Sequence, residues 1–120
     1  MWNELYAKTG KINLVIIYVS EAHASDGWAL SKEYSIPQHK NIDDRIQAAS
    51  NYINWKKLNY KTRIFVDNIE LPNFEKTYSA WPERGFVFEN GKIVYISYGT
   101  VDDQVRWGEG IDDWLRNKFK

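Results

Sequence analysis

A carboxylate and an imidazole lie two positions apart in the first quarter of the chain, where Glu21 and His23 follow a long apolar run that includes Tyr18. At this spacing a carboxylate can orient an imidazole, raise its pKa or share a proton with it. The second histidine, His39, precedes a segment with helical periodicity. Because ligands bind at the carboxyl ends of strands in open α/β sheets, we expect His39 to return to the edge where Glu21 and His23 lie.

Each of these residues also has a simpler structural interpretation. A Glu-x-His pair is common, so spacing alone favours His23 as a partly exposed loop histidine with a hydrogen-bonded neighbour. Two His and one Glu have no recognised zinc-ligand spacing, and we expect no metal site. Arg84 follows a Trp-Pro-Glu turn and could hold a carboxylate or phenolate, although sequence alone favours a solvated ion pair.

Composition excludes several classes of function. Sixteen basic residues balance sixteen acidic ones, so we expect no nucleic-acid partner. The absence of Cys excludes disulfides, thiolate metal sites and a cysteine nucleophile within these 120 residues. Six Trp and eight Tyr favour bulky core packing, and we assign Trp28 and Trp81 to the core rather than to a ligand surface. No apolar run approaches the ~20 residues of a membrane span, so we expect a soluble, cytoplasmic chain.

The elements that position these residues follow from the apolar pattern. Residues 12–19 are an almost unbroken β-branched and aliphatic run, which predicts a strand buried on both faces. Asn41 can cap a helix that continues to about Leu58. This helix has an apolar stripe formed by Ile42, Ile46, Ala49 and Ile53.

Further elements complete a single α/β domain over residues 1–120. They are a helix tail over 1–9, a strand over 62–66, a helical turn over 73–79, a hairpin of 84–88 and 92–97 around Asn90-Gly91, and a helix over 110–119 with Ile111, Trp114, Leu115 and Phe119 inward.

Three segments together resemble one family. Residues 18–28, YVSEAHASDGW, are similar to the Y-I-E-E-A-H-x-S-D-G-W signature of the iodothyronine deiodinases. Residues 36–49 resemble that family's I-P-x-H…E-D-R…A-A segment, and residues 78–84, YSAWPER, resemble its Y-G-A-x-P-E-R segment. These motifs occur in family order and spacing, which makes the resemblance more specific than any one motif.

The resemblance implies a function and a set of site residues. The family removes iodine reductively from an iodothyronine ring, with a selenocysteine or cysteine and a thiol reductant. By position, Glu21, His23 and His39 fall on family residues tied to proton transfer, whereas Arg84 and Tyr18 fall on residues at the substrate. The implied partners are an iodothyronine-like small molecule and the thiol reductant, and a homodimer is a further expectation. No cofactor is expected within this chain.

The resemblance also implies a thioredoxin-like fold, with Pro82 at the position of that fold's cis proline. Two departures qualify the match: Ser20 replaces the first Glu of the family motif, and the family's active-site strand and selenocysteine loop are not among these 120 residues. In the family that strand would separate the strand over 12–19 from the strand over 84–88. We therefore expect a domain truncated before its redox residue and inactive in deiodination by itself.

Two alternatives remain open at this point. A peroxiredoxin- or TlpA-like thiol redox protein would fit residues 78–94 nearly as well, but it would not fit residues 21–28. A non-catalytic binding module on the same fold would fit the absence of Cys.

Overall fold

The computed structural model describes residues 10, 12–30, 35–58, 63–81, 83–97 and 109–120. In chain order its elements are β1 (Val15–Tyr18), α2 (Ile42–Lys56), β2 (Arg63–Val66), α3 (Asn73–Tyr78), β3 (Phe86–Glu89), β4 (Lys92–Ile96) and α4 (Glu109–Lys118). This mixture of helices and strands confirms the expected α/β class. The helix tail expected over residues 1–9 lies outside the described residues.

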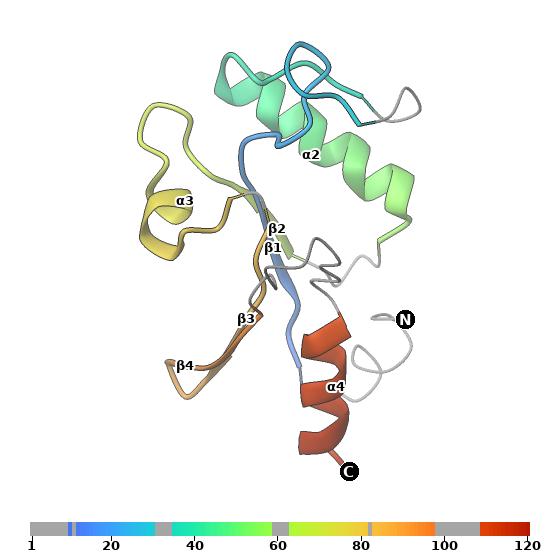
Figure 1. Cartoon of the computed structure of the whole chain (residues 1–120), viewed down its shortest axis with the longest axis vertical. Coiled ribbons are helices and arrows are strands. Elements are labelled where there is room, and N and C mark those ends of the chain that lie inside the picture. Colours follow the sequence, from blue (N-terminus) through green and yellow to red (C-terminus); the bar gives the residue numbers. More distant parts are fainter. Residues whose placement is uncertain (1–9, 11, 31–34, 59–62, 82, 98–108) are drawn as a thin grey trace.

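Within the described ranges the strands form two separate two-stranded sheets (Figure 1). β1 and β2 are parallel, with Val15 opposite Arg63 and Tyr18 opposite Val66. β3 and β4 form the expected antiparallel hairpin. Its turn is made by Asn90-Gly91, whose φ angles of +52° and +75° match the two left-handed positions of a tight hairpin turn.

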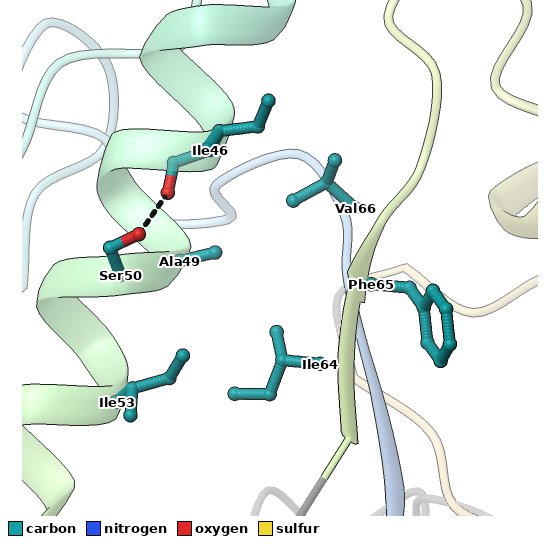
Figure 2. Close-up of a pocket in the computed structure, with 7 residues that line it drawn as sticks. All are labelled: Ile46, Ala49, Ser50, Ile53, Ile64, Phe65 and Val66. Atoms are coloured by element: carbon teal, nitrogen blue, oxygen red, sulfur yellow. Dashed lines mark hydrogen bonds between the residues drawn. The ribbon is translucent and has the colours of Figure 1, made fainter.

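The expectation that the first strand is buried on both faces is wrong. β1 is shorter than the apolar run, and Val15 is 46% exposed. The reason lies in how the parallel sheet is covered. Ile64 and Val66 of β2 point toward α2, whereas Phe65 points to the opposite side (Figure 2) and is 55% exposed. Only one face of this sheet is therefore packed against a described helix.

α2 begins where the sequence predicts. The Asn41 side chain accepts a hydrogen bond from the Asp44 backbone N–H at 2.9 Å and so caps the helix. The apolar stripe is only partly buried, because Ile42 and Ile46 are 41% and 47% exposed while Ala49 is buried. The first turns of α2 instead bury a charged residue, Arg45.

A small apolar core lies between α4 and the hairpin. Ile111 and Leu115 are buried there, and the partly buried residues packed against them are Ile12, Val87, Tyr95 and Trp114. The expectation that Phe119 faces inward is wrong: it follows the last residue of α4, Lys118, and is 45% exposed. No helix within the described ranges has the length and apolarity needed to cross a membrane.

Candidate functional site

Polar side chains converge where β1 and β2 end. Because these strands are parallel, their carboxyl ends lie at one edge, and the Asp67 N–H donates to the Tyr18 carbonyl at 2.9 Å just beyond the ladder. Glu21 follows β1, and its Oε1 lies 3.5 Å from Nε2 of His39. The Tyr18 hydroxyl donates to the same carboxylate oxygen. His39 therefore returns to this edge, as the sequence predicts.

His39 is buried in this cluster. Its ring centroid lies 5.7 Å from that of Tyr18, and its Nδ1 accepts a hydrogen bond from Arg45 Nε at 3.2 Å. Burial is the main cause that lowers the pKa of His39 below 6.5; the Glu21 carboxylate opposes this shift, and the Arg45 charge adds to it. This shift favours the neutral form of the imidazole.

A neighbouring amide holds the Glu21 backbone in place. The Glu21 N–H donates to Gln38 Oε1 at 3.0 Å, and Gln38 Nε2 donates back to the Glu21 carbonyl at 2.8 Å. The Gln38 N–H in turn donates to Asp26 Oδ1 at 2.9 Å. Sequence reasoning missed Gln38, although it directly precedes His39. These bonds fix the distance between the two segments that supply Glu21 and His39.

His23 is a half-buried loop histidine with a hydrogen-bonded neighbour, as its spacing alone favours. Its Nδ1 lies 3.0 Å from the Trp28 carbonyl oxygen, which can only accept, so Nδ1 carries the hydrogen. The neutral ring then keeps its lone pair on Nε2. Among the described contacts Glu21 pairs with Tyr18 and His39, not with His23. The suggested pairing of Glu21 with His23 is thus not formed.

Of the two residues expected at the substrate, Tyr18 lies in the cluster, whereas Arg84 has no described contact with it. Within the described part of the chain, Arg84 makes no hydrogen bond or ion pair to Glu21 or His39.

Assigning Trp28 and Trp81 to the core is wrong, because these indoles are 73% and 50% exposed. Trp28 packs edge-on against His23, with ring centroids 5.0 Å apart. Pro82 lies outside the described residues.

Two buried charged residues at this edge were not predicted. Arg45 is 4% exposed and donates Nη1–H to the Asp67 carbonyl at 2.8 Å. The Asp67 carboxylate accepts from the backbone N–H groups of Phe74 at 3.1 Å and Glu75 at 2.9 Å, which caps α3. The position of Asp67 directly after a short apolar run was a usable signal.

A separate groove of about 370 Å³ lies between α2 and β2. Figure 2 shows its lining: Ile46, Ala49, Ser50, Ile53, Ile64, Phe65 and Val66. None of the residues of the Tyr18–Glu21–His39 cluster lines it. The groove is therefore a packing feature of the helix–sheet interface and not the floor of the polar site.

Comparison with known proteins gives matches in one family. A family model described as "Iodothyronine deiodinase" matches residues 4–113. Type I iodothyronine deiodinase of Xenopus laevis is 34% identical over 83 residues, covering 69% of this chain and 31% of that protein. Thyroxine 5-deiodinase of Bos taurus is 33% identical over 110 residues, covering 87% and 35%. This chain spans about a third of the length of these relatives, and it belongs to the iodothyronine deiodinase family.

Proposed function

We propose that this chain supplies the proton-handling and substrate-holding part of an iodothyronine deiodinase-like oxidoreductase with a thioredoxin-like fold. In the reaction a ring carbon–iodine bond is replaced by a carbon–hydrogen bond, and iodine leaves as iodide. The two electrons come from a thiol reductant, which is oxidised to a disulfide. The Tyr18–Glu21–His39 cluster at the carboxyl edge of β1 and β2 is the observation that carries this proposal.

The described side chains divide these tasks. When a soft nucleophile takes the iodine, the ring carbon needs a proton. Glu21 accepts the Tyr18 hydrogen bond as a carboxylate, so it would relay a proton that it first takes up from the thiol reductant. The Nε2 lone pair of His23 can accept a hydrogen bond from a phenol, because Nδ1 is engaged with the Trp28 carbonyl. Arg84 would hold a carboxylate or phenolate of the substrate.

The nucleophile is not among these 120 residues, which contain no Cys. Histidine, glutamate and arginine side chains cannot accept an iodine equivalent and then be regenerated by a thiol. A selenocysteine or cysteine would have to be supplied from outside this sequence. The chain by itself is therefore expected to bind an iodothyronine without releasing iodide.

The test is iodide release by the natural polypeptide. The coding region would be expressed with its upstream sequence, its intact mass determined, and release of labelled iodide from thyroxine measured with a dithiol. We expect release that falls at least about 100-fold in Glu21→Gln, because a positioned proton donor typically contributes that much. Glu70→Gln, at an exposed loop glutamate, is the matched control and should retain activity.

Other outcomes would replace this proposal. Reduction of peroxides or disulfides without iodide release would favour a peroxiredoxin- or TlpA-like thiol redox protein. Binding of iodothyronines by a natural product that lacks both selenocysteine and cysteine would favour a non-catalytic binding module.

A further inference from the structure

Arg45 is buried, and its described hydrogen bonds go to acceptors other than carboxylates. Its side chain is 4% exposed, yet among the described residues it forms no ion pair with a carboxylate. Its hydrogen bonds go to the Asp67 carbonyl and to Nδ1 of His39. The Asp67 carboxylate is engaged by backbone N–H groups of α3. The charges of Asp67, Glu75 and Glu21 lie near the guanidinium, but the imidazole is the titratable side chain to which it hydrogen-bonds.

The contact with Arg45 determines where His39 carries its hydrogen. An arginine Nε–H can only donate, so His39 Nδ1 must accept and must hold a lone pair. The single hydrogen of the neutral ring then lies on Nε2. Nε2 lies 3.5 Å from Oε1 of Glu21, so the N–H faces the carboxylate. Among the described residues this buried nitrogen makes no hydrogen bond, and the contact is one of charge and proximity. Protonation at Nδ1 would bring two N–H donors face to face in a buried space.

We propose that Arg45 is a positioning residue of this site, which holds His39 as the neutral Nε2–H tautomer with its N–H directed at Glu21. Only the use of that N–H in deiodination rests on the proposed function. In this role His39 is a hydrogen-bond donor and not a proton acceptor. Glu21, which accepts a hydrogen bond from Tyr18 and faces His39, is then the group that takes up and passes on a proton.

The two histidines make the proposal testable without any substrate. His23 and His39 are the only histidines in the sequence, and their described contacts require opposite tautomers. Long-range ¹H–¹⁵N correlation spectra of the ¹⁵N-labelled chain distinguish Nδ1–H from Nε2–H, and a His23→Gln variant assigns the signals. We expect His39 to show the Nε2–H pattern at neutral pH, so failure of deiodination would leave this result unaffected.

Arg45→Met removes both the donor and the charge, while Arg45→Lys keeps the charge and loses the planar guanidinium that bridges His39 and Asp67. The groups that face His39 are Glu21 and Tyr18 from the β1 side and Asp44 and Arg45 from α2. The titration midpoint of His39 should rise in Arg45→Met and rise less in Arg45→Lys. Arg116→Met, at an exposed position of α4, should leave it unchanged.

An Nδ1–H signal for His39 in the unsubstituted chain would overturn the proposal. So would a folded Arg45→Met variant whose His39 titrates as in the parent chain. If neither Arg45 variant folds, the tautomer of the unsubstituted chain still decides, because an Arg45 donor is incompatible with hydrogen on Nδ1.

Discussion

At the residue scale, the site depends on which nitrogen of each histidine carries its hydrogen. His23 faces a carbonyl oxygen and must donate through Nδ1, whereas His39 faces Arg45 and must accept through Nδ1. Sequence spacing identified both histidines but could not assign these roles. The partner of His23 is the backbone carbonyl of Trp28, and the partner of His39 is the Arg45 side chain, six residues later in the sequence. Only the folded chain brings these partners into contact.

Acidification should lower the free energy of unfolding, because protonation of His39 favours the unfolded chain. The pKa of His39 in the folded chain lies below the ordinary value of 6.5, so the unfolded chain binds more protons as the pH falls through and below 6.5. The free energy of unfolding should therefore fall between about pH 7 and pH 5.5, by at most about 1.4 kcal/mol per pH unit. Urea unfolding followed at several pH values measures this slope.

The two histidines provide the control for this pH dependence. His39→Gln should flatten the slope, whereas His23→Gln leaves His39 in place and should preserve it. A free energy of unfolding that increases on acidification over this range, or an unchanged slope in His39→Gln, would contradict the assignment.

Asp67 should contribute strongly to stability because its buried carboxylate contacts several groups at once. Its carboxylate accepts from the N–H groups of Phe74 and Glu75, and its charge lies near buried Arg45. Asp67→Ala would leave these groups without that partner and should lower the free energy of unfolding by about 1–3 kcal/mol. Asp113→Ala, at an exposed position of α4, should change it by less than about 0.5 kcal/mol. Similar urea midpoints for both variants would disprove this role.

At the element scale, features determined by local chemistry could be predicted from the sequence. Two such features are the Asn41 cap, which sets the start of α2, and the Asn90-Gly91 turn of the hairpin. Each depends on neighbours within a few positions along the chain. The exposure of β1 could not be predicted in this way. An apolar run shows that a strand can be buried on both faces, but the elements that pack against it decide whether it is.

Gly85 marks the close approach of the hairpin to α4. A Cβ at this position would overlap the Ile111 side chain and lie 3.0 Å from Ser97 Oγ. Gly85→Ala should therefore lower the free energy of unfolding by about 1–3 kcal/mol. Adding Ile111→Val removes the Cδ1 atom that the new methyl group meets and should restore part of the loss. Gly27→Ala, with 3.7 Å to the nearest atom, is the control, and equal effects in thermal unfolding would refute this account.

At the scale of the whole molecule, the sequence predicted the α/β class and the edge at which Tyr18, Glu21 and His39 meet. It did not predict the buried pair of Arg45 and Asp67. Charged residues are rarely buried, so a sequence pattern assigns them to the surface by default. Their burial depends on hydrogen bonds between α2 and the end of β2, which are separated by more than twenty positions along the chain.

The apolar packing between α2 and the parallel sheet is incomplete, which predicts opposite outcomes for two adjacent alanines. Ala49 lines the groove of about 370 Å³, whereas Ala48 is equally buried, at 5% against 4% exposed, but does not line it. Ala49→Leu should fill part of the groove and raise the free energy of unfolding by about 1–2 kcal/mol. Ala48→Leu should lower it by about 1–3 kcal/mol, because Ala48 is buried and does not line this groove, so the larger side chain overpacks its surroundings.

Both substitutions change helix propensity equally, since the same residue types are exchanged in the same helix. Any difference between them in urea unfolding therefore reports the packing around each position. Shifts in the same direction would mean that the groove closes around Ala49 in solution. Opposite shifts would show that the interface between α2 and β2 has room for additional apolar side chains, and that its limited packing restricts the stability of the element that positions His39 and Arg45.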